Sequence, residues 1–226
     1  MAWNSLDKCY LLQAESVGLV GKMSSGPSIV WATARVDASN PILSSRRTVG
    51  RALALQLLVA LGGEGWTIEI DARGKPVACG ASERHISIAH TGNIVAATAS
   101  AVGPIGIDVE YRDPARDLNR LALAAYGPAE CRAVATHGVS AFYRIWTLRE
   151  AISKVTGDGM ALVTDRIDRV PMGMMDGSLV AAGDEWLFAH EVIAQEHSLA
   201  LVVRVASAEA RSAAQSRSLD SLRLRT

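Results

Sequence analysis

Two carboxylates stand two residues apart in the segment 105–111, at Asp108 and Glu110. The segment alternates strictly between apolar and other residues, which predicts a strand with both carboxylates on one face, and Gly106 leaves room beside them. Neighbouring carboxylates repel, and a hard cation such as Mg²⁺, which prefers a few carboxylates together with waters and phosphate oxygens, relieves that repulsion. Taken alone, the segment is better explained as a half-buried strand with a solvated acidic face.

A second polar pair lies in residues 140–156, whose pattern predicts the longest clear helix of the chain. Apolar residues recur there at helical spacing: Phe142, Ile145, Leu148, Ile152 and Val155. Tyr143, Thr147, Glu150 and Lys154 form a second stripe on one face. Glu150 could supply a third carboxylate, and Lys154 could hold phosphate oxygens or assist a leaving group. The alternative is an ordinary surface Glu–Lys pair, which contributes a few tenths of a kcal/mol.

Basic residues upstream could bind an anion. Arg46, Arg47 and Arg51 cluster at the start of a predicted helix, where cations oppose the helix dipole unless an anion occupies that end. A solvated basic turn explains them equally well. Lys75 lies in a loop between glycine and proline, and His90 lies at the end of a predicted strand, where a single histidine is usually structural.

The elements that must position these residues follow from periodicity and from turn signals. Strands are predicted at 28–36, 66–71, 85–91, 94–101, 105–111, 166–170, 185–192 and 198–206. Helices are predicted at 46–61, 118–126, 128–136 and 140–156, and residues 72–84 are predicted as a loop. This order predicts an α/β (α+β) fold made of two similar halves, 1–104 and 105–206, followed by a flexible tail, 207–226.

Composition narrows the function classes. The formal net charge is zero, so the overall charge favours neither nucleic acid nor a membrane surface. The Arg-bearing tail lacks interleaved aromatic residues, and the apolar stretch 52–61 is too short to span a bilayer. The three cysteines (Cys9, Cys79, Cys131) lie far apart without metal-site spacing, and no secretory signal pattern opens the chain, so we expect a cytoplasmic protein.

The two acidic segments together resemble a known signature. The run 106–110 (Gly-Ile-Asp-Val-Glu) is followed after 35 residues by 146–154 (Trp-Thr-Leu-Arg-Glu-Ala-Ile-Ser-Lys). This pair, in this order and spacing, resembles the double motif of the surfactin-type 4′-phosphopantetheinyl transferases. Weaker matches flank it at 47–50, 74–76 and 87–91, so the resemblance covers about residues 44–160.

The resemblance implies a pseudo-twofold fold with the active site between its halves, and coenzyme A and Mg²⁺ as ligands. By position, Asp108, Glu110 and Glu150 would hold the cation, and Lys154 would contact the phosphates. The remaining contacts to coenzyme A would come from the first half: Arg47, Lys75, His90 and Thr91. A serine of an apo acyl or peptidyl carrier protein would attack the β-phosphate and release 3′,5′-ADP, with Glu150 as base, directly or through a water.

Two departures from the family pattern matter. Ala89 stands where the family usually has serine, and Arg149 stands where it usually has lysine. They motivate one alternative, a catalytically weak module that binds coenzyme A or a carrier protein. A metal-dependent phosphohydrolase using the same three acids is another. Two fused halves would make one site without a partner, so we expect a monomer. Position and charge suggest carrier docking near Arg112, Arg116 and Arg120.

Overall fold

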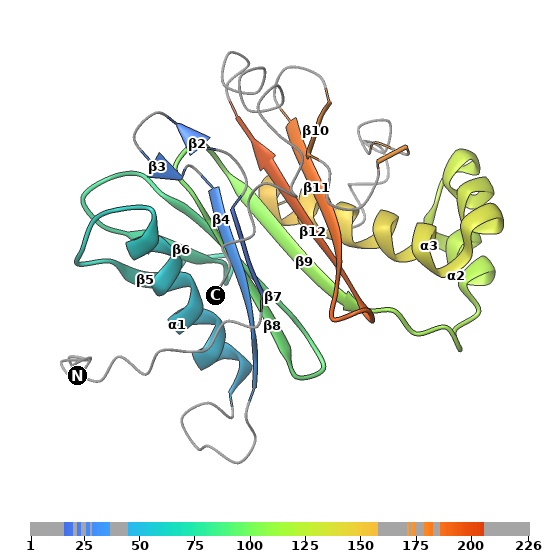
Figure 1. Cartoon of the computed structure of the whole chain (residues 1–226), viewed down its shortest axis with the longest axis horizontal. Helices are drawn as coiled ribbons and strands as arrows, with labels where there is room; N and C mark the ends of the chain where they lie inside the picture. Colours follow the sequence, from blue (N-terminus) through green and yellow to red (C-terminus); the bar gives the residue numbers. More distant parts are fainter. Residues whose placement is uncertain are drawn as a thin grey trace.

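The computed structural model describes residues 16–19, 22–23, 26–27, 29–36, 45–157, 171, 173–174, 179–182 and 186–205. Two four-stranded antiparallel sheets and three helices make up most of this part of the chain (Figure 1). The predicted strand at 166–170 and the predicted tail at 207–226 lie outside the described residues. No helix in the described ranges is long and apolar enough to cross a membrane.

The first sheet has the order β1-β4-β8-β7. Its strands are β1 (Ser16–Leu19), β4 (Ile29–Arg35), β7 (His85–Thr91) and β8 (Ile94–Ser100), and helix α1 (Arg46–Ala60) packs on its outer face. Gly92 connects β7 to β8 with φ near +53°, a left-handed conformation that glycine adopts without strain. The predicted hairpin, strand 28–36 and helix 46–61 are thus confirmed within a residue or two.

The second sheet has the order β10-β11-β12-β9. Its strands are β9 (Ile105–Tyr111), β10 (Leu179–Ala182), β11 (Trp186–Ile193) and β12 (His197–Arg204). Helices α2 (Leu118–Ala125) and α3 (Pro128–Thr156) lie between β9 and β10 in the chain. The helical run of α3 is interrupted at Gly138, whose φ of +56° is not helical, so the two predicted helices 128–136 and 140–156 correspond to its two segments.

Two short pairs complete the described structure. Strand β2 (Lys22–Met23) pairs with β3 (Gly26–Pro27), and β5 (Thr67–Ile70) pairs with β6 (Pro76–Cys79). Strand β6 corrects the prediction of a continuous loop over residues 72–84. The strand is only four residues long and begins at a proline, so its own sequence gives little strand signal.

Both halves repeat one topology, a strand, a helix and then two strands, with the last strand central in its sheet. The first half follows β4-α1-β7-β8 and the second follows β9-α3-β11-β12. In each case the last strand pairs antiparallel to both of the others. The structure therefore confirms the predicted α/β (α+β) fold with two similar halves.

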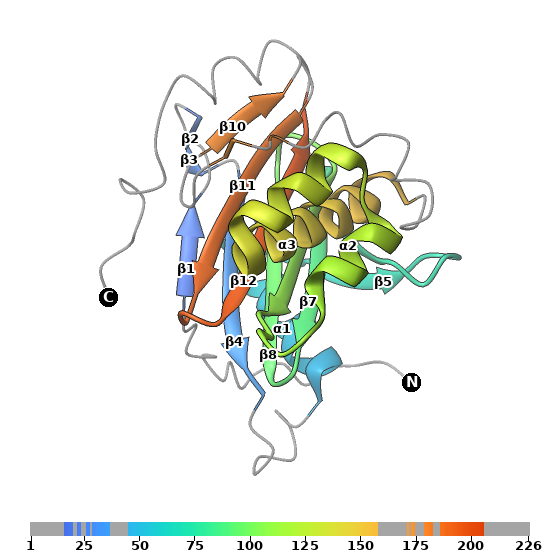
Figure 2. The same cartoon turned by 90° about the vertical axis from the view of Figure 1, so that its right-hand side faces the viewer.

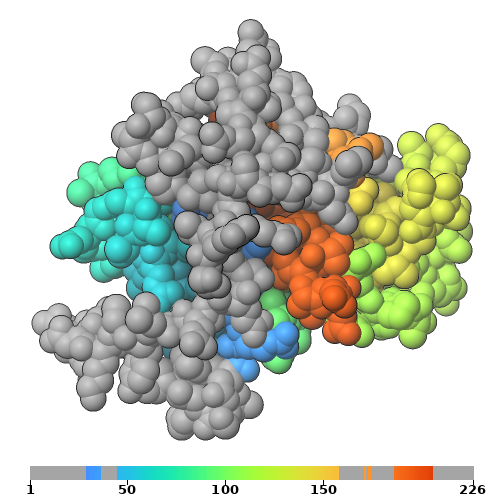
Figure 3. Space-filling view, viewed as in Figure 1, coloured from blue at the N-terminus to red at the C-terminus, as the bar shows by residue number. Residues whose placement is uncertain are grey.

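The molecule has four layers, helix, sheet, sheet and helix. One apolar core lies between the sheets and draws Ile29, Trp31 and Ile94 from the first and Ile107, Leu199 and Leu201 from the second. The second core lies under α1, and a third lies between the second sheet and α3, which covers that sheet in Figure 2. In the space-filling view, α2 and α3 lie on the side of the molecule opposite α1 and the β5–β6 hairpin (Figure 3).

The sheets meet where β7 and β9 lie side by side. The Ser87 hydroxyl accepts a hydrogen bond from the Ile107 N–H at 3.2 Å, and the Thr91 hydroxyl accepts one from the Tyr111 N–H at 3.3 Å. Both pairs are 20 residues apart in sequence, so the two strands run parallel here. Side-chain hydroxyls, and not a backbone ladder, connect the two halves along this line.

Candidate active site

Gly106 lets strand β9 approach helix α3 closely. A Cβ atom at this position would lie 2.0 Å from the Ala151 carbonyl oxygen, which real side chains do not tolerate. The sequence therefore permits backbone-to-backbone contact between the strand and the last turns of the helix. This contact carries Asp108, two residues further along β9, to the end of α3 where Lys154 lies.

Asp108 and Lys154 form the closest polar contact of this region. The Lys154 ammonium donates to Asp108 Oδ1 at 2.7 Å and to the Ile107 carbonyl at 2.9 Å. Asp108 is only 6% exposed, and its second oxygen, Oδ2, is buried without a hydrogen-bond partner among the described residues. Burial raises the pKa of Asp108, and the charge of Lys154 opposes that rise.

Glu110 and Glu150 are half-buried and electrostatically coupled to Asp108. Burial is the main cause that raises the pKa of each, and the charge of Asp108 raises both further. Arg116 opposes the shift of Glu110, and Lys154 opposes that of Glu150. The Thr91 hydroxyl also donates to Glu110 Oε2 across a long 3.5 Å contact. The three carboxyls thus share one electrostatic environment that disfavours their ionisation.

Carboxylate oxygens are the ligands that Mg²⁺ prefers, so the chemistry of this set fits a hard cation. The unsatisfied Oδ2 of Asp108 and the mutual repulsion of the carboxyls are both features that a cation would relieve. The described residues, however, contain no group of three or more His, Cys, Asp or Glu side chains arranged to hold a metal ion. The assignment of a metal to Asp108, Glu110 and Glu150 stays a prediction.

Lys75 brings the first half into contact with the end of α3. Its ammonium donates to the Lys154 carbonyl at 2.7 Å, although the two residues are 79 apart in sequence. The Asp71 side chain shapes the turn, because Oδ1 accepts from the N–H groups of Arg73 and Lys75. Burial lowers the pKa of Lys75, and Asp71 opposes that shift. Lys75 thus holds a backbone carbonyl in the last turn of α3, a favourable place for a cation.

The other residues predicted to contact coenzyme A differ in their exposure to solvent. His90 is exposed at the end of β7, close enough for its charge to favour ionisation of Asp108. Thr91, half-buried beside it, contacts Glu110 and Tyr111 as described above. Arg47 is exposed in the first turn of α1, which contains no acidic residue and has no side-chain cap. The structure thus brings His90 and Thr91 to the carboxylates and Lys75 to the last turn of α3, and gives no contact between Arg47 and the carboxylates within the described residues.

Two residues of the predicted polar stripe are not available to a ligand. Tyr143 and Thr147 are buried; the Thr147 hydroxyl donates to the Tyr143 carbonyl at 2.8 Å, and the Tyr143 hydroxyl accepts from the Asp113 N–H at 3.2 Å. Tyr143 belongs to the apolar cluster that α3 forms with α2, and the Thr147 hydroxyl is bonded within its own helix. Only Glu150 and Lys154 of the four keep partial exposure.

Ser198 is a polar residue that sequence reasoning missed. It is the register partner of Glu110 across the β9–β12 pair, its side chain is fully buried, and its Oγ has no hydrogen-bond partner among the described residues. The strand itself was predicted, but strand pairing between segments almost 90 residues apart cannot be read from their patterns. Its buried hydroxyl adjoins the acidic face of β9.

The two departures from the family pattern both lie away from the carboxylates. Ala89 is buried in the core between the sheets. Arg149 is buried against α2 and the start of α3, where it pairs with Glu130. Neither side chain has a described contact with Asp108, Glu110 or Glu150.

Comparison with known proteins associates this region with one enzyme superfamily. Residues 104–202 match the model of the 4′-phosphopantetheinyl transferase superfamily. The matched part contains β9, α2, α3, β11 and most of β12, and thus all three carboxylates and Lys154.

Individual relatives give the same indication. The chain is 32% identical over 126 residues to 4′-phosphopantetheinyl transferase HetI of Nostoc sp., which covers 51% of this chain and 53% of the relative. It is 30% identical over 89 residues to 4′-phosphopantetheinyl transferase AcpT of Salmonella typhi, which covers 38% of this chain and 46% of the relative. The chain thus spans about half the length of the curated relatives it matches, and over that span it is similar to proteins named as 4′-phosphopantetheinyl transferases.

Proposed function

We propose that this protein transfers the 4′-phosphopantetheine arm of coenzyme A to a serine of an acyl or peptidyl carrier protein, releasing 3′,5′-ADP. The observation that carries the proposal is the 2.7 Å contact between Asp108 and Lys154. It joins the two acidic segments, 46 residues apart in sequence, within the region that matches the transferase superfamily. The presence of both halves in one chain supports a surfactin-type, monomeric enzyme.

The roles of the carboxylates follow from their chemistry. Asp108, Glu110 and Glu150 would hold Mg²⁺, which when bound would neutralise charge on the diphosphate of coenzyme A. Lys154 pairs with Asp108 and would exchange this contact for one with phosphate oxygens. Lys75, His90 and Thr91 would contact the phosphate groups, and Arg47 would do so at the nucleotide end.

The transfer step needs a base, an acceptor and a leaving group. The serine Oγ forms a bond to the β-phosphorus of coenzyme A, and the bond from that phosphorus to the bridging oxygen breaks, so that 3′,5′-ADP leaves with the electron pair. The serine proton passes to Glu150, directly or through a water. Burial raises the pKa of Glu150, and a raised pKa makes a carboxylate a better proton acceptor near neutral pH. Positioning by the surrounding residues supplies most of the remaining rate.

The two halves would have different roles in the reaction. Residues 1–104 would supply the contacts to coenzyme A, and residues 105–206 would supply the metal site and the docking surface. Arg112 and Arg116, between β9 and α2, and Arg120, in the first turn of α2, would attract an acidic carrier helix. The free thiols Cys79 and Cys131 suit a reducing compartment, so we place the reaction in the cytoplasm.

Product analysis tests the proposal. The protein is incubated with coenzyme A and Mg²⁺, with and without an apo carrier protein, and 3′,5′-ADP is quantified by chromatography. Release of 3′,5′-ADP in equal amount to carrier supports the transferase. Cleavage of coenzyme A without a carrier would identify a phosphohydrolase. Tight coenzyme A binding without release on several carriers would leave only a binding module.

A further inference from the structure

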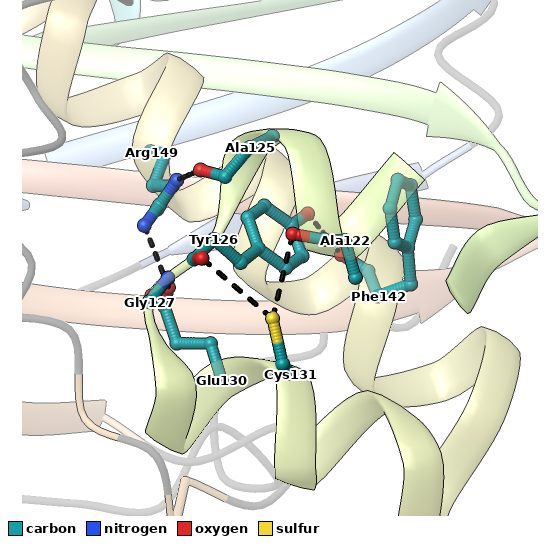
Figure 4. Close-up of polar contacts among 8 residues, drawn as sticks. All are labelled: Ala122, Ala125, Tyr126, Gly127, Glu130, Cys131, Phe142 and Arg149. Atoms are coloured by element: carbon teal, nitrogen blue, oxygen red, sulfur yellow. Dashed lines mark hydrogen bonds and ion pairs between the residues drawn. The ribbon is translucent and has the colours of Figure 1, made fainter. Parts of the chain in front are cut away.

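Arg149 lies at the centre of a buried polar cluster outside the candidate site (Figure 4). Its side chain is 1% exposed. One guanidinium nitrogen, Nη2, contacts Glu130 Oε2 at 2.6 Å, and the other, Nη1, donates to the Ala125 carbonyl. The guanidinium carbon also lies 4.6 Å from the centre of the Tyr126 ring, within the range of a cation–π contact.

The partners of Arg149 belong to separate pieces of the helical region. Ala125 is the last residue of α2, Tyr126 follows it, and Glu130 lies in the first turn of α3. Glu130 Oε2 additionally accepts from the Gly127 N–H at 3.0 Å, which caps the start of that helix. Arg149 itself lies beyond the interruption at Gly138, on the second segment of α3. One guanidinium therefore fastens the end of α2 and the first segment of α3 to the segment that carries Glu150.

The fastened pieces, α2, Tyr126 and the first segment of α3, form an apolar unit that we call the wedge, and its outer side is exposed. Inside it, the Tyr126 hydroxyl donates to the Phe142 carbonyl at 2.9 Å, and the two rings stack at a tilt. On its outer side, α2 exposes Leu121 and Leu123, the latter 77% exposed. This outer side follows directly on the Arg112–Arg120 segment to which we assign carrier docking. The wedge is thus the part of the chain whose angle to Glu150 sets where a docked carrier would lie.

The choice of an arginine suits this task. A planar guanidinium can bind a carboxylate, a carbonyl and a ring face at once, whereas an ammonium is a single point of charge. A buried ion pair often adds little net stability over an apolar pair, but removal of one partner leaves an unpaired buried charge. The geometry that the pair enforces is therefore the better explanation of its presence than the stability it adds.

We propose that Arg149 is a positioning residue that fixes α2 and the first segment of α3 relative to Glu150, and thereby governs the use of the carrier protein and not the binding of coenzyme A. The inference rests on the proposed transferase function. It gives a role to a residue that departs from the family pattern, in which a lysine usually stands at this position. An Arg149→Lys variant should lose carrier transfer, because lysine cannot hold Glu130, Ala125 and Tyr126 together.

The test compares two acceptors. One is the intact apo carrier, and the other is a short peptide that contains only the carrier's modified serine and its neighbours, which reaches the acids but not the wedge. The variants are Arg149→Lys and the double variant Arg149→Met with Glu130→Met, which leaves no unpaired buried charge. Arg132→Met is the matched control, because Arg132 is an exposed arginine of the first segment of α3. Folding is checked by thermal melting, and coenzyme A affinity is measured by calorimetry.

We expect kcat/KM for the intact carrier to fall by about tenfold to a hundredfold in both variants, with the larger part in KM. In both variants, the Kd for coenzyme A and kcat/KM for the peptide should stay within about twofold of the wild-type values. In the Arg132→Met control, every readout should stay within the same range. Equal losses on carrier and peptide, or a weakened Kd for coenzyme A, would overturn the inference while the transferase stands. A wild-type protein that transfers nothing to either acceptor would instead overturn the proposed function, and the inference with it. If the double variant does not fold, Arg149→Lys, which keeps a charge opposite Glu130, decides between these outcomes.

Discussion

The two halves share a topology but place different residues at equivalent points. The first strand of the first half, β4, is apolar and buried along nearly its whole length. Its counterpart in the second half, β9, carries Asp108 and Glu110 on one face. The helices differ in the same way, because α1 packs on its sheet through Val49, Leu53 and Leu57 whereas α3 also presents Glu150 and Lys154 near its own sheet.

Glycine controls helix-to-sheet contact in both halves, but from opposite sides. In the first half the glycine is on the helix, and a Cβ at Gly50 would meet the Ile88 side chain at 2.7 Å. In the second half it is on the strand, and a Cβ at Gly106 would meet the Ala151 backbone at 2.0 Å. A helix glycine makes room for a neighbouring side chain, so the first contact is a packed apolar one. A strand glycine makes room for the helix backbone, so that Asp108, two residues after it, can contact Lys154 of α3.

The comparison teaches that one topology can support either a packing interface or a charged site. The difference lies in a glycine on the strand and in polar residues two and four positions after it. The predictions below test that contrast.

The largest effect is expected when a carboxylate of the second half is neutralised. Glu150→Gln should lower kcat for transfer by about a hundredfold or more, because it removes the proposed base and a proposed cation ligand. The matched control is Glu69→Gln, an exposed carboxylate of β5 in the first half, which should leave the rate unchanged. Steady-state rates with a saturating carrier measure both. An equal loss in the two variants would remove the distinction between the halves.

The next largest effect is expected when Gly106 or Gly50 is replaced by alanine, and equilibrium urea unfolding measures it. Gly106→Ala should lower the free energy of unfolding by about 1–3 kcal/mol or more, because the new methyl group meets a backbone oxygen that cannot move without the helix. Gly50→Ala should cost less, since the Ile88 side chain can shift and alanine favours the helix by about 0.5–1 kcal/mol. A Gly106→Ala protein as stable as wild type would contradict the close approach of β9 to α3.

A substitution at Ala89 tests whether this position of β7 packs in the core or contacts the ligand. Ala89→Ser, which restores the usual residue of the family pattern, should lower the free energy of unfolding by about 1 kcal/mol, because its hydroxyl enters the core between the sheets. The Kd for coenzyme A, measured by calorimetry, should not change. A clearly tighter Kd would show that position 89 faces the ligand and would favour the binding-module alternative.

The smallest effect is a graded pH dependence of the ligand-free protein. Burial raises the pKa values of Asp108, Glu110 and Glu150, so between their ordinary and raised values the folded state binds more protons than the unfolded state. The stability contribution of these groups therefore falls as pH rises through that window. Glu110→Gln should flatten the decline in urea unfolding measured at a series of pH values. A decline that is unchanged in this variant would mean that Glu110 does not contribute to it.

Much of the fold could be predicted because its signals are local. Strict alternation identified β9, a glycine turn identified the β7–β8 hairpin, and spacing identified the second segment of α3. Strand β6 was missed because its four residues give no period of their own and depend on pairing with β5.

The site could be predicted only where its residues share an element. The shared face of Asp108 and Glu110 follows from one strand, and the step from Glu150 to Lys154 follows from one helix. Contacts between distant segments gave no such signal, as with Lys75 and the Lys154 carbonyl, which are 79 residues apart. The pairing of Arg149 with Glu130 gave no signal either, because Glu130 lies 19 residues away across the interruption of α3.

The most direct test of the central claim is the intact mass of a purified apo carrier protein after incubation with this protein, coenzyme A and Mg²⁺. The account predicts a gain of one phosphopantetheine arm per carrier, and no gain when EDTA removes divalent cations. Several unrelated carriers that gain no mass, with the protein shown to be folded, would contradict transfer, and a full gain in excess EDTA would contradict the assignment of a cation to Asp108, Glu110 and Glu150.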